Sequence, residues 1–257
     1  RDQPRSRGLG DVYKRQIFAQ YVSGIGILLY VLFRCRSLFP ERKDLCFDGG
    51  ILKEIAGLSS LTCLQQSVMN FGILMVQGLV NSFGATTMAA FAAAVKIDTF
   101  AYLPVQDFGN AYSTFIAQNY GAGNKERIRR GTKESFAIST AFSLVISALV
   151  FAFAAPLMQI FVSSAETAVI ASGVRYLRIE GAFYFGIGCL FLLYGYYRAI
   201  KRAEMSVVLT VISLGIRVLL AYVLSATFLG ETGIWMAIPI GWILADLTGL
   251  LYMRKTW

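Results

Sequence analysis

Three ionisable side chains interrupt a mostly apolar segment between residues 85 and 130: Lys96, Asp98 and Asp107. A charge at the centre of a membrane-spanning helix costs about 2.5–3.5 kcal/mol on insertion scales, so a residue retained there is a candidate for function. Such groups can form ion pairs, bind a proton or a cation, or contact a polar substrate. Lys96 and Asp107 are about 16 Å apart along one helix, so each needs a partner from another helix.

Polar side chains form a stripe on each of two consecutive predicted helices. In the helix predicted over 51–81, four amides fall within an arc of about 60°: Gln66, Asn70, Gln77 and Asn81. The next helix carries a second stripe of Lys96, Thr99, Asp107, Asn110, Thr114 and Gln118. Asp98 lies about 200° from that stripe, so we expect it to pair elsewhere. Amides that face lipid lose their water partners, so both stripes should face protein or a wet cavity.

Two interpretations of these stripes stay open. Single amides join membrane helices through hydrogen bonds worth about 1 kcal/mol each. Two neighbouring polar faces are better explained as the lining of a cavity. The candidates for a substrate cavity or for ion coupling are therefore Gln66, Asn70, Gln77, Lys96, Asp98, Asp107, Asn110 and Thr114.

Several functional classes are not expected. The chain has no histidine, and its four cysteines lack the spacing of metal ligands, which argues against a zinc site or a Cys/His nucleophile. No catalytic residue, cofactor or bound metal is predicted, and the chain is not expected to be an enzyme. No Gly-rich Walker loop is present, so energy for transport would come from an ion gradient, H⁺ or Na⁺. The chain has a net charge of +9, but its basic residues are not interleaved with aromatic residues as on a nucleic-acid-binding surface.

The elements that must position these residues are predicted membrane-spanning helices. Hydrophobic residues make up 56% of the chain, and no charged residue occurs from Ile55 to Val95. That interval is about twice the length that crosses a bilayer, so it holds two helices. Seven spans are predicted, over residues 17–33, 51–81, 85–120, 135–162, 167–200, 205–228 and 234–253. The fifth is expected to be one long helix whose apolar centre is 181–197.

The distribution of basic residues predicts the orientation. Lys and Arg cluster in alternate connections, around residues 34–53, 125–133, 198–202 and 254–255, whereas the other turns contain almost none. The positive-inside rule therefore places these connections and the C-terminus in the cytoplasm of a multi-pass protein. Arg175, Arg178 and Glu180 are expected near the interface in a structural role. Arg217 and Asp246 are candidates for one ion pair between the last two spans.

The predicted domain organisation has four parts. Residues 1–16 are polar and basic and resemble read-through of a sequencing adapter, so they are expected to be non-native or disordered. The alternative is a natural basic tail. Residues 17–33 form one span, 34–50 a cytoplasmic connector, and 51–257 a six-helix lobe.

The segment from Gly57 to Arg130 resembles the second half of a multidrug and toxic compound extrusion (MATE) transporter, in particular its DinF-type branch. The residues that carry the resemblance are Leu64–Ser67, Val80–Gly84, Val95–Asp98, Gln118–Asn124 with Arg127, and Tyr197–Lys201. The family implies an all-α integral membrane fold of twelve helices in two lobes. This chain would be the six-helix C-terminal lobe with one preceding helix, and its partners would be the lipid bilayer and the missing N-terminal lobe.

The resemblance also implies a function. Members of this family export small organic, often cationic compounds in exchange for H⁺ or Na⁺ by alternating access, with the substrate between the lobes. The expected location is the plasma (inner) membrane of a bacterium, and one lobe alone is expected to be inactive. The alternative is a flippase for lipid-linked oligosaccharides, from the same superfamily. Some members bind the cation through acidic residues in the seventh and tenth helices. The corresponding regions here read Gln65–Ser67 and Gly186–Gly188, which makes a cation site in this lobe doubtful.

Overall fold

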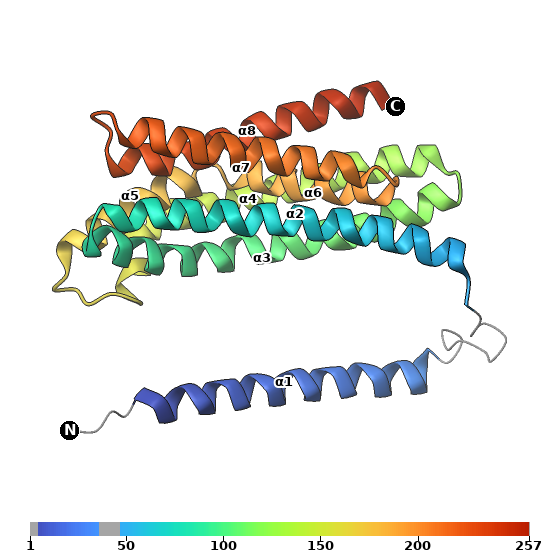
Figure 1. Ribbon diagram of the computed structural model, residues 1–257, viewed down its shortest axis with the longest axis horizontal. Coiled ribbons are helices and arrows are strands. Elements are labelled where there is room, and N and C mark those ends of the chain that lie inside the picture. Colours follow the sequence, from blue (N-terminus) through green and yellow to red (C-terminus); the bar gives the residue numbers. More distant parts are fainter. Residues whose placement is uncertain (1–4, 36–46, 257) are drawn as a thin grey trace. The chain divides into compact units, whose positions relative to one another are not determined.

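The computed structural model describes residues 5–35 and 47–256, and every regular element in these ranges is a helix (Figure 1). Most of the predicted connector 34–50 therefore lies outside the described residues. The chain divides into two units, residues 1–53 and 54–257. Each unit is described by itself.

The first unit contains helix α1 (Arg5–Arg34), with an apolar stretch from Ile17 to Arg34 long enough to cross a membrane. Its first residue is Arg5, so the predicted boundary at Ile17 is not a helix boundary. The basic residues before Ile17 continue the helix of the span. Whether they belong to the native protein stays a prediction.

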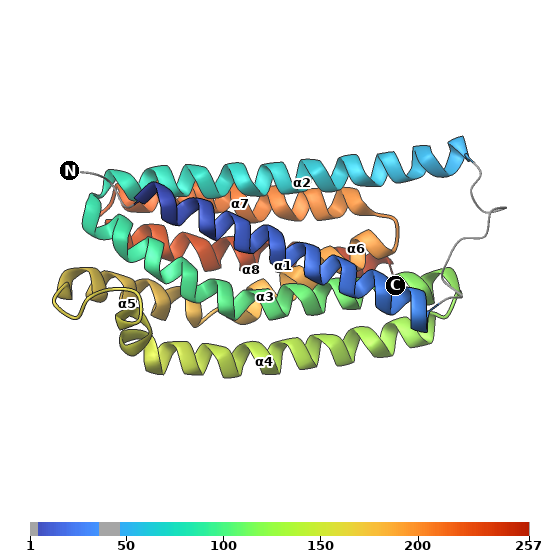
Figure 2. The same ribbon diagram turned by 90° about the horizontal axis from the view of Figure 1, so that it is seen from below.

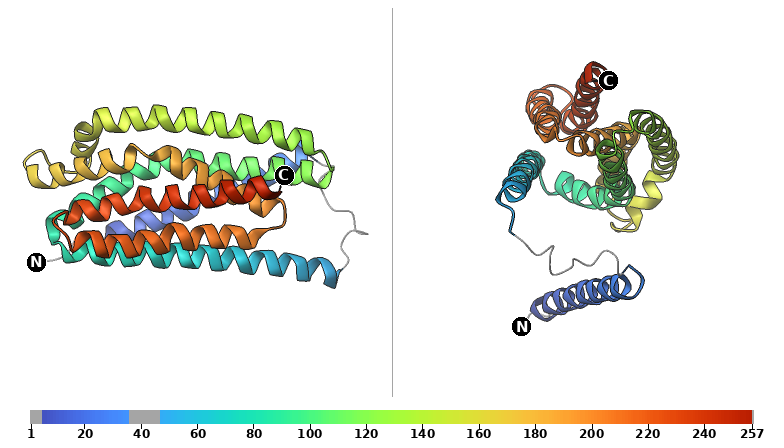
Figure 3. Two further views of the ribbon diagram at one scale, coloured as in Figure 1. Left: turned by 90° about the horizontal axis from the view of Figure 1, so that it is seen from above. Right: turned by 90° about the vertical axis from the view of Figure 1, so that its right-hand side faces the viewer.

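The second unit contains a helical bundle. Its helices are α2 (Gly49–Ser82, which begins at the end of the first unit), α3 (Ala85–Gly121), α4 (Lys125–Gln159), α5 (Thr167–Gly181), α6 (Tyr184–Ala199), α7 (Ala203–Ser225) and α8 (Glu231–Thr256). These helices run nearly side by side along the length of the bundle (Figure 2). Within it, α6 packs against α3, α4, α7 and α8 (Figure 3). Leu192, Leu193 and Tyr197 of α6 are fully buried.

Short polar turns set the ends of these helices. Gly84 separates α2 from α3 with φ of 99°, a conformation that favours glycine. The turn between α3 and α4 contains Gly123, with φ of 68°, and Asn124. The Asn124 side chain accepts a hydrogen bond of 3.0 Å from the backbone N–H of Arg127, which caps α4. The segment Gln118–Asn124, the most specific part of the family resemblance, is thus a tight helix–turn–helix junction.

The number of spans agrees with the prediction once a bent pair is counted as one crossing. Among the described residues, six helices are long and apolar enough to span a membrane, and α5 with α6 qualifies as a seventh crossing bent by 51°. A single helix over 167–200 was predicted, and this is wrong. The backbone leaves the helical conformation at Phe183 (φ −116°, ψ 19°), so α5 ends at Gly181 and α6 begins at Tyr184.

Glycines near this bend lie where neighbouring helices approach closely. A Cβ on Gly188 would lie 2.9 Å from the Ser143 hydroxyl oxygen of α4, and one on Gly181 would lie 3.2 Å from a Val150 methyl carbon. Two turns further along the same side of α6, a Cβ on Gly195 would lie 2.7 Å from the carbonyl oxygen of Gly109 in α3. Glycine lets α6 approach α3 and α4 at distances that any side chain would prevent.

Candidate functional site

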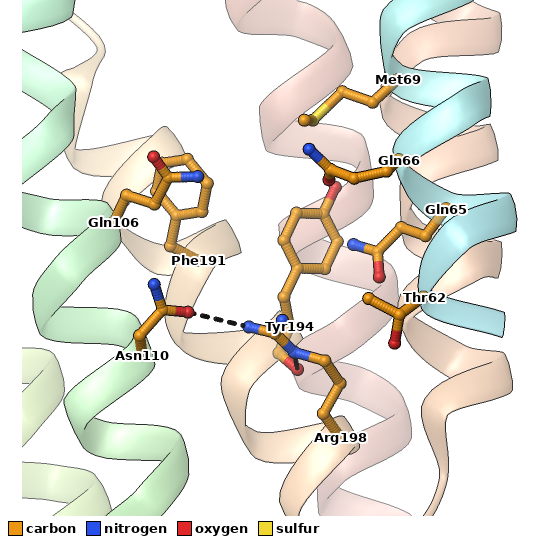
Figure 4. Close-up of a pocket in the computed structure, with 9 residues that line it drawn as sticks. All are labelled: Thr62, Gln65, Gln66, Met69, Gln106, Asn110, Phe191, Tyr194 and Arg198. Carbon is orange, nitrogen blue, oxygen red and sulfur yellow. Dashed lines mark hydrogen bonds between the residues drawn. The ribbon is translucent and has the colours of Figure 1, made fainter. Parts of the chain in front are cut away.

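A polar pocket lies between α2, α3 and α6. It is lined by Thr62, Gln65, Gln66 and Met69 of α2, Gln106 and Asn110 of α3, and Phe191, Tyr194 and Arg198 of α6. Figure 4 shows the α2 and α3 side chains facing each other across this space, with those of α6 between them. The lining combines amides, one cation and two aromatic rings, which suits a polar or cationic organic molecule.

Two of the eight predicted residues, Gln66 and Asn110, line this pocket. An Arg198 guanidinium N–H donates a hydrogen bond of 3.3 Å to the Asn110 side-chain oxygen, and its Nε–H donates to the Tyr194 carbonyl at 3.2 Å. These bonds hold the guanidinium at the edge of the pocket. The sequence analysis missed the contribution of α6. The signal was available, because Phe191, Tyr194 and Arg198 recur at helical spacing along one face.

Five other predicted residues lie outside the pocket. Asn70, Gln77, Asp107 and Thr114 are exposed on α2 and α3, and Thr114 donates a hydrogen bond of 3.2 Å to the Asn110 carbonyl in its own helix. The Lys96 ammonium lies 5.8 Å from the centre of the Phe161 ring, beyond the end of α4. The structure therefore does not bring Lys96 together with Gln66 and Asn110.

The eighth residue, Asp98, forms part of a second polar site inside the bundle. Asp98 of α3 is 4% exposed and Glu180 of α5 is 6% exposed. The Tyr184 hydroxyl of α6 donates a hydrogen bond to the Asp98 carboxylate. The two carboxyl groups interact with each other, and the Tyr176 hydroxyl is a neighbour of both. One oxygen of each carboxylate, Asp98 Oδ2 and Glu180 Oε2, is buried without a hydrogen-bond partner. We call Asp98 and Glu180 the carboxylate pair.

Glu180 is a correction to the sequence analysis, which placed it near the membrane interface beside Arg175 and Arg178. The two arginines do have partners near α5: Arg175 forms an ion pair of 3.4 Å with Glu231, and Arg178 lies 5.4 Å from the Phe151 ring centre. Glu180 instead points into the bundle. Tyr176, Glu180 and Tyr184 are spaced by four residues, which places them along one side of a crossing. That spacing could have indicated Glu180 from sequence.

The predicted ion pair between Arg217 and Asp246 is also wrong. Within the described part of the chain, neither residue forms an ion pair. Asp246 of α8 is buried against Cys189 and Gly186 of α6. Arg217 of α7 instead acts electrostatically on both members of the carboxylate pair, and its buried Nε lacks a hydrogen-bond partner. Arg217 and Asp246 thus interact with different groups: Arg217 with the carboxyl groups of α3 and α5, and Asp246 with α6.

Two interacting carboxyl groups inside a membrane protein can do specific chemistry. They can share a proton or hold a small cation, because both operations remove negative charge from a low-dielectric site. Tyr176 and Tyr184 supply hydroxyl donors, and Tyr176 packs edge-on against Trp235 of α8 with ring centres 4.9 Å apart. Among the described residues, no group of three or more His, Cys, Asp or Glu side chains could hold a metal ion. The arrangement therefore suits a proton or an alkali cation better than a transition metal.

Glycine-packed spans, one bent crossing and two polar sites of this kind define a multi-pass helical membrane protein. The comparison with known families agrees: the MatE family model matches residues 61–223. The chain belongs to the MatE family, whose members include multidrug and toxic compound extrusion proteins.

Curated relatives and solved structures support the same assignment. The chain is 30% identical over 194 residues to the probable multidrug resistance protein YpnP of Bacillus subtilis, an alignment that covers 74% of this chain and 42% of that protein. It is 26% identical to the probable multidrug resistance protein NorM of Thermotoga maritima, over 92% of this chain and 51% of the relative. A MOP superfamily transporter from Pyrococcus furiosus shares the fold, with a TM-score of 0.82 at 23% identity over 90% of this chain and 52% of that one. The chain thus spans about half the length of its relatives.

Proposed function

We propose that this chain is the C-terminal lobe of a secondary active transporter that exports small organic, often cationic compounds in exchange for H⁺ or Na⁺. The observation that carries the proposal is the carboxylate pair, buried in the same lobe as a polar pocket. Asp98 and Gln106 are eight residues apart on α3, which corresponds to about 12 Å. The two sites are thus connected along one helix, with Pro104 between them.

The exposed polar faces of α2 and α3 support a second lobe on that side. Asn70, Gln77 and Asp107 are exposed in this lobe, and amides or carboxylates facing hydrocarbon are costly. Two-lobed transporters place the substrate between their repeats and alternate access by rocking one repeat against the other. We infer the same arrangement here, with the basic connections and the C-terminus on the cytoplasmic side of a bacterial inner membrane.

The flippase alternative has less support. A flippase for such a lipid should have several cations in its cavity, and Lys96 lies over Phe161 rather than in the pocket. Arg198 does line the pocket, but one of its N–H groups is engaged by Asn110. One partly engaged guanidinium is a weak anchor for a lipid diphosphate, which is commonly bound by several free cations.

The test is efflux by the complete protein. The gene is recovered from its source DNA with whatever precedes residue 1, and the product is reconstituted in liposomes with a fluorescent cationic dye. An imposed H⁺ or Na⁺ gradient should drive dye movement in the wild type. Asp98→Asn should reduce this movement by about tenfold or more, because removing one member of a coupled pair changes the ion affinity of the other.

Glu204→Gln is the matched control. Glu204 is exposed in the first turn of α7, away from the pair, so its loss removes one negative charge without touching the site. The control should transport dye like the wild type. If neither gradient moves dye in the wild type, or if Asp98→Asn transports normally, the proposed function is wrong.

A further inference from the structure

The charges around the carboxylate pair come from separate helices. Asp98 lies on α3, Glu180 and Tyr176 on α5, and Tyr184 on α6, while α8 contributes the indole of Trp235 next to Tyr176. The cation that acts on both carboxylates is Arg217 of α7. The other cations on α3 and α5 face elsewhere: Lys96 toward Phe161, Arg175 toward Glu231 and Arg178 toward Phe151.

Arg217 is close to the pair but not bonded to it. Its guanidinium forms no ion pair with either carboxylate of the described lobe, and its Nε is buried without a partner. Its Cβ packs near Gly241 of α8, 3.2 Å from where a glycine Cβ would lie, so the base of the side chain is fixed. The guanidinium is thus a permanent positive charge within electrostatic range, and it leaves one oxygen of each carboxylate unpartnered.

A fixed positive charge lowers the affinity of the carboxylate pair for every cation, but the consequence differs between ions. Two buried carboxyl groups bind a shared proton strongly, because burial and mutual repulsion both favour the neutral form. The pair therefore still binds a proton when a guanidinium is nearby. A sodium ion must first shed its water and then find several oxygen ligands, so its affinity is weak from the start. Repulsion by the Arg217 guanidinium lowers this affinity further, so that sodium does not bind.

We propose that Arg217 is an ion-selectivity residue: its guanidinium lets the carboxylate pair take up a proton and excludes a metal cation. The proposal rests on the proposed function and names its coupling ion. The proton sits on one carboxyl oxygen and is donated to the other carboxylate, so no further ligand is needed. Arg217 is a positioning charge rather than a group that touches the transported compound.

The first experiment measures sodium binding to this chain in lipid nanodiscs, with radioactive sodium as the probe. The wild type should show no saturable sodium binding. Arg217→Gln removes the guanidinium and should raise sodium affinity by about tenfold or more, as expected when a unit charge is removed at short range in a medium of effective dielectric about 20. Asp98→Asn added to Arg217→Gln should abolish the new binding.

Two further variants keep the experiment decisive. Arg217→Lys retains the charge and should behave like the wild type. Arg129→Gln removes an exposed arginine from the first turns of α4 and should also leave sodium binding absent. Saturable sodium binding by the wild type that Asp98→Asn eliminates would overturn the proposal, even if Arg217→Gln fails to fold. So would a folded Arg217→Gln variant that gains no sodium binding.

Transport by the complete protein separates this inference from the proposed function. Dye efflux driven by a pH gradient, with no response to sodium, supports both. Efflux driven by a sodium gradient alone contradicts the role of Arg217 but leaves the transporter function intact. Absence of any gradient-driven efflux contradicts the proposed function, and the sodium-binding result then decides the selectivity of the pair by itself.

Discussion

The pocket between α2, α3 and α6 and the carboxylate pair between α3, α5 and α6 share two helices but are built from different chemistry. The pocket is lined by uncharged amides, aromatic rings and one arginine, with Gln66 and Asn110 exposed. The pair is ionisable and almost completely buried, with unpartnered oxygens. Exposed amides exchange water for many ligands at little cost, whereas a buried carboxylate responds strongly to one added charge. This difference is the basis for proposing recognition at the pocket and coupling at the pair.

The largest effect on transport is expected when the second acid of the pair is neutralised. Glu180→Gln in the complete transporter should lower uphill dye transport by about tenfold or more, because the pair can no longer exchange its ion normally. Dye binding at equilibrium, measured by fluorescence polarisation, should stay within about twofold of the wild type, because the pocket is intact. An equal loss of dye binding and dye transport would mean that the pocket and the carboxylate pair act as a single binding site.

A change of packing should affect the pocket before the pair. Gly195→Ala places a methyl group 2.7 Å from the Gly109 carbonyl oxygen, so α3 and α6 must separate beside Asn110 and Arg198. We expect a loss of about 1–3 kcal/mol in stability, typical of overpacking. The measurement is thermal unfolding in detergent. Gly78→Ala on α2 is the control, because a Cβ there meets nothing within 4 Å, and its unfolding temperature should not fall.

A smaller effect is expected from the hydrogen bond inside the pocket. Asn110→Ala removes the acceptor of the Arg198 guanidinium, and the loss of a bond to a charged group at a partly exposed site corresponds to about 1 kcal/mol, or roughly fivefold in dye affinity. Titration of the dye gives the affinity directly. Thr114→Ala, one turn further along α3, should leave dye affinity unchanged. A fivefold change in the Thr114→Ala variant instead would place the binding surface outside the pocket.

The smallest effect concerns the surface. Lys201 forms an ion pair of 2.5 Å with Glu54, and the carboxylate raises the pKa of the lysine. This stabilisation is present below the ordinary lysine pKa of about 10.4 and is lost as the pH rises through the higher value in the folded protein. Because the pair is exposed, Lys201→Ala should leave the unfolding temperature at neutral pH unchanged within error. A clear decrease would show that this pair anchors α2.

The fold was predictable because apolar length and charge distribution define spans without knowledge of packing. The crossing at 167–200 differed, because apolar length does not indicate the break in the helix at Phe183. Asp98 could be singled out as a charge in an apolar helix, and its departure from the stripe of α3 indicated a separate partner. For Glu180 the available signal was its four-residue spacing from Tyr176 and Tyr184, and the expectation of a straight helix through residue 183 placed it near the interface instead.

The polar stripes show a second limit of sequence reasoning. Periodicity placed Gln66 and Asn110 on the polar stripes of their helices, and both line the pocket, whereas Lys96 shares the stripe of Asn110 but lies near Phe161. Periodicity gives the direction of a side chain around one helix but not the neighbour that it meets along that helix. The cavity assignment stays a prediction for four exposed residues that do not line the pocket: Asn70, Gln77, Asp107 and Thr114.

The bend between α5 and α6 has a consequence for how the chain enters a membrane during synthesis. The two half-helices have 15 and 16 residues, each shorter than the roughly 20 needed to cross a bilayer. Neither can be released into lipid as a stable segment, and the first half contains Arg175, Arg178 and Glu180. Arg217, the cation on α7 that acts electrostatically on Glu180, is translated later than either half. We therefore expect this crossing to complete its insertion only after α7 has been made. It would then pack against the other helices of the bundle instead of entering the lipid alone.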